Sequence, residues 1–142
     1  MAARIQVTFD ALDPMRLGEF WAATLGYVEE PPPAPYASWD EALDAMGVPG
    51  DQRDTAYALV DPDGAGPRLF FQKVPERKES KNRVHLDVNV VSDAAGDRRP
   101  DAVRARAAEL EALGAVRVYE KAALGSFWVT MQDPEGNEFC VQ

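Results

Sequence analysis

The sequence predicts an α+β fold made of two tandem βαβββ modules. Three observations predict it: runs that alternate apolar and polar residues, as half-buried strands do; helical segments between them; and the same order of one strand, a helix and three strands in each half of the chain. We expect one domain over residues 1–142, with module one at about 1–76 and module two at about 82–142.

Module one begins with an alternating strand and a helix. Asp13-Pro14 is typical of a helix start, and Gly26 is a favourable end after Leu25. Residues 30–54 are proline-rich and irregular, because proline is excluded from sheet interiors; a capping-box pattern at 38–41 predicts one short helix there, ending at Gly47. The expected strands are 4–10, 27–29, 55–60 and 68–74.

Module two follows a charged connector at 75–81 and begins with the stretch that carries the single histidine, His85. Val84, Leu86, Val88 and Val90 alternate there with Arg83, His85, Asp87 and Asn89. After a polar loop at 94–100, Asp101 is expected to cap a helix that Gly114 ends. The expected strands are 82–90, 115–120, 127–132 and 138–142.

Composition excludes several classes of protein. The chain has 142 residues, 46% of them hydrophobic, which suits one compact domain. A net charge of -9 argues against general nucleic-acid binding and against an anionic membrane surface. No apolar run approaches about 18 residues, so we expect a soluble, cytoplasmic protein. The single cysteine, Cys140, excludes an intrachain disulfide and a cysteine-rich zinc site.

Short matches support the internal repeat. The aligned segments are 4–7 with 83–86, 61–64 with 133–136, and 69–72 with 139–142. This alignment makes Gln6 equivalent to His85, and Phe70 equivalent to Cys140.

This organisation resembles the vicinal oxygen chelate superfamily (glyoxalases, bleomycin resistance proteins and extradiol dioxygenases), and within it the glyoxalase-like domains of bacteria. The resemblance covers essentially the whole chain. It is carried by Phe20-Trp21 with Leu25-Gly26, by 83–88, and by 133–141. It implies that both modules form one cupped mixed sheet with the helices outside. It leaves the function open, because the superfamily hosts many chemistries on one scaffold.

Strand alternation divides the side chains between two faces. The helix side is expected to hold Ile5, Val7, Phe9, Leu69, Phe71, Val84, Leu86, Val88, Phe139 and Val141. The cup is expected to hold Gln6, Thr8, Asp10, Arg68, Phe70, Gln72, His85, Asp87, Asn89, Glu138, Cys140 and Gln142, with Trp128 and Thr130 beside them. A concave face of mixed polar and aromatic groups is the default ligand site.

The resemblance also implies where a metal would bind. Metal-dependent members use four positions, equivalent here to Gln6, Phe70, His85 and Cys140. His85 is a good ligand and Gln6 a weak one, whereas Phe70 has no donor atom and Cys140 is a soft thiol where glutamate is usual. Glu138 lies one pleat away on the same face. A metal, if present, would therefore use His85, Gln6 and Glu138.

Single residues keep alternative interpretations. His85 is interpreted as a hydrogen-bonded histidine in a polar cup, as a ligand contact, or as a metal ligand or general base. For Asp87 the alternatives are that it orients His85, that it acts as a base, or that it is simply solvated or paired. Trp128 stacks on a ligand or packs, and Cys140 is a small buried residue or a reactive one.

We expect metal-independent binding of a small molecule in the cup, with no cofactor. The contacts expected are Gln6, Thr8, Phe70, His85, Asp87, Trp128, Thr130 and Cys140. The alternative is a divalent-metal-dependent lyase or dioxygenase-like enzyme that uses His85. The resemblance further implies a homodimer.

Overall fold

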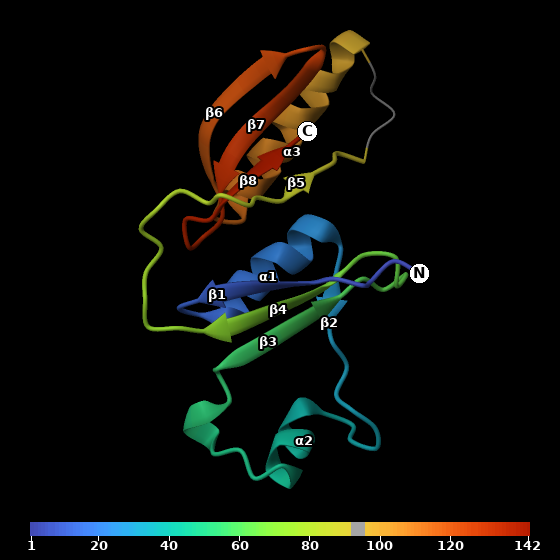
Figure 1. Cartoon of the computed structure of the whole chain (residues 1–142), viewed down its shortest axis with the longest axis vertical. Coiled ribbons are helices and arrows are strands. Elements are labelled where there is room, and N and C mark those ends of the chain that lie inside the picture. The colour runs from blue at the N-terminus through green and yellow to red at the C-terminus, as the bar shows by residue number, and fades with distance from the viewer. Residues whose placement is uncertain (92–95) are drawn as a thin grey trace. The chain divides into compact units, whose positions relative to one another are not determined.

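The computed structural model describes residues 1–91 and 96–142, and for Asp97 the backbone alone. Its strands form two four-stranded sheets, and each sheet has one long helix after its first strand (Figure 1). The chain divides into two compact units, Met1–Glu76 and Arg77–Gln142. The α+β class and the two tandem βαβββ modules predicted from the sequence are confirmed.

The first unit holds a sheet of order β1-β4-β3-β2, in which β1 and β4 are parallel and the other pairs antiparallel. Its elements are β1 (Gln6–Ala11), α1 (Pro14–Leu25), β2 (Val28–Glu29), α2 (Trp39–Ala45), η1 (Gly50–Gln52), β3 (Ala56–Val60) and β4 (Arg68–Lys73). The irregular stretch 30–54 thus contains the predicted short helix.

The second unit repeats this topology with the order β5-β8-β7-β6, and β5 is parallel to β8. Its elements are β5 (Asp87–Val88), η2 (Gly96–Arg98), α3 (Arg99–Ala112), β6 (Val116–Ala123), β7 (Ser126–Gln132) and β8 (Glu138–Val141). The registers agree with the predicted repeat, because Phe70 lies opposite Thr8 in one sheet and Cys140 lies opposite Asp87 in the other.

Local signals explain where the helices of the first unit begin and end. The Asp13 side chain accepts a hydrogen bond from the backbone N–H of Arg16, and Gly26 ends α1 in the left-handed conformation. At α2, the Ser38 hydroxyl accepts from the N–H of Glu41, whose carboxylate accepts from the N–H of Ala37. The Ser38 half of the predicted capping box is therefore present, while Glu41 accepts from the residue before the cap and not from Ser38 itself.

Each unit buries one helix against one face of its own sheet. In the first unit Phe9 stacks on Phe71 with ring centroids 4.9 Å apart and lies 5.3 Å from Trp21 of α1. The buried side chains of the second unit include Val103, Ala107, Leu110, Val129, Met131, Phe139 and Val141. Burying a large apolar side chain contributes roughly 1.5–3 kcal/mol, so these two faces hold the helices in place.

The strand predicted at 82–90 is shorter than expected: only Asp87–Val88 is strand, with backbone hydrogen bonds from Leu86 to Val90. Extending the parallel register places Val84 opposite Asn137, before β8 begins. Val84 has no strand partner there and is 84% exposed, so its prediction as a helix-facing residue was wrong. Ile5, which precedes β4 in the same way, is 71% exposed and was also predicted wrongly.

Two further boundaries differ from the prediction. Arg98, not Asp101, occupies the cap position of α3, and Asp101 lies within the first turn of the helix. The strand predicted at 115–120 extends to Ala123, because a two-residue turn lets β6 pair with β7 as far as Ser126. The predicted loop at 94–100 lies partly outside the described residues. In the described ranges, no helix has the length and apolar character needed to cross a membrane.

Candidate functional site

The second sheet has one face covered by α3 and one polar face. Val129, Met131 and Val141 are fully buried on the helix side, and strand side chains alternate between faces. The side chains that alternate with these define what we call the polar face: Asp87, Trp128, Thr130, Glu138, Cys140 and Gln142. His85 lies just before β5 and joins this face.

Four residues of the polar face form a compact cluster, which we call the His85 cluster: His85, Asp87, Thr130 and Cys140. The register places Asp87, Cys140 and Thr130 side by side on three adjacent strands. Ligand-type atoms of His85, Asp87 and Cys140 all lie within 4.8 Å of one another. Nδ1 of His85 is 2.7 Å from Oδ1 of Asp87, and the Thr130 hydroxyl is 3.6 Å from the Cys140 sulfur.

The environment keeps Cys140 in its thiol form. Burial raises the pKa of Cys140, and the negative charge of Asp87 raises it further, while the hydrogen bond with Thr130 acts in the opposite direction. Reactive cysteines need a lowered pKa, since the thiolate is the nucleophile. The structure therefore favours Cys140 as a half-buried polar contact.

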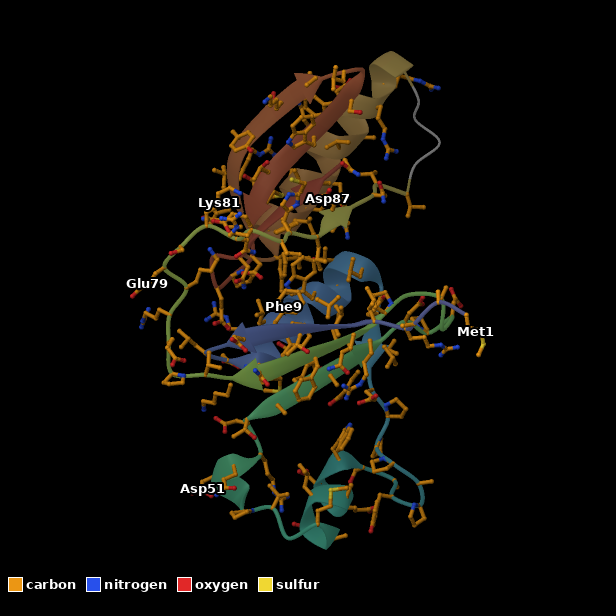
Figure 2. All side chains as sticks on the ribbon, in the orientation of Figure 1. Met1, Phe9, Asp51, Glu79, Lys81 and Asp87 are labelled. Carbon is orange, nitrogen blue, oxygen red and sulfur yellow. The ribbon has the colours of Figure 1, made fainter. Side chains whose placement is uncertain are left out.

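His85 and Asp87 are accessible, with 42% and 41% of their side chains exposed. Asp87 lies on β5, beside which Figure 2 labels it. Of the two imidazole nitrogens, Nδ1 is engaged by Asp87. Among the described residues, no side chain or backbone group is hydrogen-bonded to Nε2. That nitrogen is consequently the free coordinating or hydrogen-bonding atom of the cluster.

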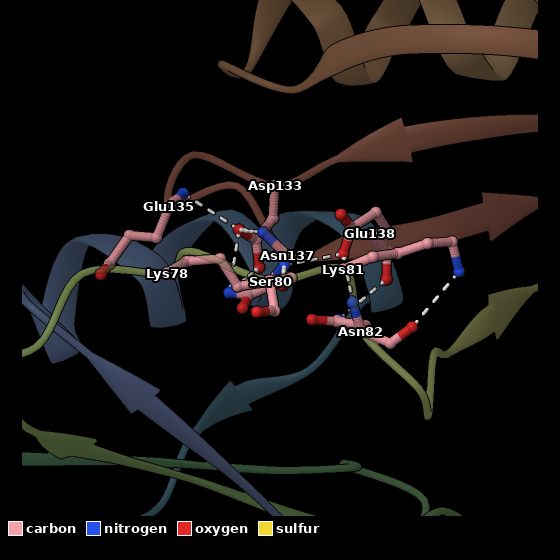
Figure 3. A network of polar contacts seen from close by, with 8 residues as sticks. All are labelled: Lys78, Ser80, Lys81, Asn82, Asp133, Glu135, Asn137 and Glu138. Atoms are coloured by element: carbon pink, nitrogen blue, oxygen red, sulfur yellow. Dashed lines mark hydrogen bonds and ion pairs between the residues drawn. The ribbon is translucent and has the colours of Figure 1, made fainter.

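Glu138 has a structural role at the edge of this face. Its carboxylate pairs with Lys78 at 3.0 Å and accepts the backbone N–H of Asn82 at 2.9 Å, which ties the connector to β8 (Figure 3). Burial raises the pKa of Glu138, but the contacts with Asn82 and Lys78 outweigh burial and lower it to about 2. One oxygen of the carboxylate, Oε2, thus holds both of these protein partners.

The turn before β8 explains why Glu138 is placed so firmly. Asp133 is buried, and one of its carboxylate oxygens accepts the backbone N–H groups of Glu135 and Asn137 (Figure 3). The Asn137 side-chain amide donates to the same carboxylate. These bonds complete an Asx-type turn and start β8 at a fixed residue.

In the first unit, the predicted contact residues already satisfy one another. The Gln6 carbonyl oxygen accepts from Arg68 at 2.8 Å, and the Gln6 amide donates to the Thr8 hydroxyl at 3.2 Å. Arg68 also forms a two-bond ion pair with Glu30 and lies over the Phe70 ring, 5.2 Å from its centroid. Phe70 supplies no donor atom at the position equivalent to Cys140.

Trp128 is half-buried on the polar face, two residues along β7 from Thr130. The Lys121 ammonium lies 5.9 Å from its ring centroid, and the two residues are register partners. Sequence reasoning missed Lys121, because a register shift between Arg117 and Tyr119 changes which residues of β6 lie opposite β7. It also missed the pairing of Arg68 with Glu30, whose only signal was opposite charge.

A cavity of about 400 Å³ lies elsewhere in the second unit, between the start of α3 and the end of the β6–β7 hairpin. Its lining includes Arg99, Pro100 and Phe127. The Arg99 guanidinium is already bonded to the carbonyl oxygens of Val90 and Gln142. The cavity contains none of the predicted site residues, and the His85 cluster has the richer chemistry.

The sequence profile of the glyoxalase-like domain matches residues 6–142. A search of curated proteins gave no match. Solved structures similar to the chain include the fosfomycin resistance protein FosX from Listeria monocytogenes, in complex with Mn(II) and 1S,2S-dihydroxypropylphosphonic acid. It is 11% identical, with TM-score 0.66, and the match covers 100% of this chain and 92% of that one.

Two further structures share the fold. One is a glyoxalase/bleomycin resistance protein/dioxygenase family enzyme from Burkholderia phytofirmans, 14% identical, with TM-score 0.63 and coverage of 96% and 94%. The other is a possible glyoxalase from Bacillus cereus, 16% identical, with TM-score 0.61 and coverage of 100% and 99%. At these identities the likeness concerns the fold alone.

Proposed function

Since the chain belongs to the glyoxalase-like domain family, we propose that it binds a small molecule on the polar face of the second sheet, without a metal ion. One observation supports this most: His85 presents a free Nε2 within a cluster of polar groups, on the same face as Trp128. A few convergent polar groups beside an aromatic surface are typical of small-molecule sites.

The four positions used by metal-dependent members of the superfamily support metal independence. Phe70 has no donor atom, and Gln6 is hydrogen-bonded to Arg68 and Thr8. Glu138, the remaining acidic candidate, is held by Lys78 and Asn82. Of the residues expected to hold a metal, Gln6 and Glu138 are thus tied to protein partners, while Nε2 of His85 has none among the described residues. The predicted contacts from both modules remain part of this proposal.

A second function, metal-dependent catalysis of the lyase or dioxygenase type, is favoured by one observation. The donor atoms of His85, Asp87 and Cys140 lie within 4.8 Å of one another. The FosX complex contains Mn(II), an ion that prefers carboxylate, carbonyl and water oxygens, whereas a cysteine sulfur selects softer ions such as Zn²⁺. This donor set therefore does not fit Mn²⁺.

Metal analysis separates the two functions. Protein purified without a polyhistidine tag should contain no stoichiometric zinc, nickel, manganese or iron. Titration with each ion should leave the melting temperature unchanged. Stoichiometric metal that the variant His85→Ala loses would overturn the proposed function in favour of the second one.

Trp128 provides a direct readout of ligand binding. In a variant with Trp21→Phe and Trp39→Phe, the remaining indole fluorescence comes from Trp128 alone. Binding of small aromatic molecules from a fragment collection should change this fluorescence, and His85→Ala in the same background should weaken the change. Saturable binding by another method, with no change in fluorescence, would contradict the placement of Trp128 in the site.

A further inference from the structure

We infer that Asp87 is a positioning residue that holds the His85 imidazole with its proton on Nδ1, and that the site in consequence takes a ligand bearing an O–H or ring N–H donor. The statement about Asp87 stands on the geometry of the free protein. The statement about the ligand rests on the proposed function.

The tautomer follows from the chemistry of the contact. Nδ1 of His85 and Oδ1 of Asp87 are 2.7 Å apart. An ionised carboxylate only accepts hydrogen bonds, so Nδ1 must carry the proton in this pair. In a neutral imidazole the other nitrogen, Nε2, then has a lone pair and accepts. Asp87 thereby decides which kind of partner His85 can take.

The other donors near the His85 imidazole are engaged with neighbouring groups. The Thr130 hydroxyl is buried and its contact is with the Cys140 sulfur, a weak donor. Lys81 carries a charge that acts on Cys140, and one of its three N–H groups donates to the carbonyl oxygen of Asn82. A ligand that reaches the cluster meets the Nε2 lone pair and the Asp87 carboxylate, which favour a donor and disfavour an anion.

Trp128 borders the cluster on the side away from His85. It lies two residues from Thr130 on the same face of β7, a separation of roughly 7 Å along a strand. His85 lies at the other end of the row formed by the register partners Asp87, Cys140 and Thr130. The ligand class therefore rests on the donor that meets Nε2, and phenols and N–H heterocycles supply such a donor.

The tautomer can be measured without a ligand, because His85 is the only histidine in the chain. Protein labelled with ¹⁵N in the imidazole gives one pair of ring signals. At about pH 8.5, roughly two pH units above the ordinary imidazole pKa, long-range ¹H–¹⁵N spectra should show a protonated Nδ1 and an unprotonated Nε2. A protonated Nε2 in the wild type would overturn the inference.

Asp87→Asn tests the cause. This variant should shift the His85 signals towards the Nε2-protonated tautomer, as an amide no longer requires the proton on Nδ1. Asp101→Asn is the matched control, because Asp101 lies on α3 at the opposite face; it should leave the signals unchanged. A folded Asp87→Asn protein with the wild-type tautomer would show that Asp87 has no positioning role.

Three matched probes test the ligand class: 4-methylphenol, its methyl ether 4-methylanisole, and 4-methylbenzoate. The phenol should shift the Nε2 signal of His85, with an affinity at least about tenfold higher than that of the ether, which lacks the donor. The benzoate should not bind. Equal or stronger binding of the ether or the benzoate would overturn the ligand class while supporting the proposed function. No perturbation by any probe at millimolar concentration would overturn the ligand class as well.

Discussion

At the scale of single residues, Glu138 gives the second unit an acid-sensitive contact. The side chains of Glu138 and Lys78 are only 15% and 19% exposed, and the pKa of Glu138 is lowered from 4.5 to about 2. A group whose pKa is lower in the folded state stabilises that state above its unfolded pKa. The contribution of Glu138 is therefore present above about pH 4.5 and is lost as the pH falls towards 2.

We expect Glu138→Gln to lower the free energy of unfolding by about 1–3 kcal/mol at pH 7, because it removes a hydrogen-bonded ion pair. Urea unfolding at pH 7 and at about pH 3 measures this, and the difference from wild type should shrink at the lower pH. Glu109→Gln is the control: Glu109 pairs with Arg106 on α3 but is 63% exposed, so its loss should have little effect. An equal effect at both pH values would contradict the role given to Glu138.

Gly18 shows a close approach that only glycine permits. A Cβ atom at this position of α1 would lie 2.3 Å from Cδ1 of Tyr57. We expect Gly18→Ala to destabilise the protein by about 1–3 kcal/mol, as overpacking does, despite the better helix propensity of alanine. Chemical denaturation checks this. Gly50→Ala is the control, because its Cβ would meet nothing within 4 Å. A stabilised Gly18→Ala variant would contradict the close packing of α1 on β3.

The residues of the candidate site differ in how far the sequence predicts them. Alternation and the repeat placed Asp87, Cys140 and Thr130 on one face, and their registers agree. The pairing of Glu138 with Lys78 was not foreseeable from the pattern, because both charges lie in stretches where solvated side chains are the usual outcome. The contact of Lys78 with β8 depends on how the chain folds back between residues distant in sequence, and the alternation of apolar and polar residues carries no information about that path.

At the scale of elements, the β6–β7 turn has a residue poorly suited to its conformation. Leu124 and Gly125 connect Ala123 to Ser126, and both have positive φ, 51° and 77°. A two-residue turn of this kind favours Asn-Gly, whereas leucine pays a steric cost in the left-handed region. Leu124 is also fully exposed, so it gains nothing from burial.

We expect Leu124→Asn to raise the free energy of unfolding by about 1 kcal/mol. Thermal and urea denaturation measure it. Leu113→Asn is the matched control, since Leu113 is half exposed and has an ordinary φ of −89°; it should bring no gain. Equal effects of the two substitutions would show that the change in polarity, and not the backbone conformation of Leu124, determines the result.

Elements were predicted best where their signals are local. Helix α1 begins and ends at the predicted residues because Asp13 and Gly26 act within one turn of the chain. The strand containing His85 was overestimated because alternation continues past the point where β8 supplies a partner. Asp101 resembles a cap in sequence, but Pro100 already fits the first turn of α3 and the helix begins earlier.

At the scale of the whole molecule, we propose a homodimer, as the resemblance to the superfamily implies. Size-exclusion chromatography with light scattering should then give about twice the chain mass of 15.6 kDa. Raising the salt concentration should not dissociate it, because a net charge of −9 on each chain makes the copies repel and salt screens that repulsion. A mass of one chain at micromolar concentration would contradict the proposal.

The repeated topology was predictable from the sequence because it depends on element order. Both sheets place the first strand of the module beside the last. The last two strands, β3 and β4 in one unit and β7 and β8 in the other, also pair in equivalent registers. The chemistry of each sheet was harder to predict, since the equivalent positions diverged. Phe70 lies under a guanidinium in one unit, while Cys140 lies beside a carboxylate in the other.

The central position of β4 and β8 has a consequence for protein synthesis. In the first unit β4 lies between β1 and β3, and in the second β8 lies between β5 and β7. The first strand of each sheet therefore cannot pair until the final strand of that unit has left the ribosome. The first unit has all its strands once Lys73 emerges, and units made first generally fold first during translation. The His85 strand likewise stays unpaired until β8 is translated some fifty residues later, which gives the first unit time to fold alone.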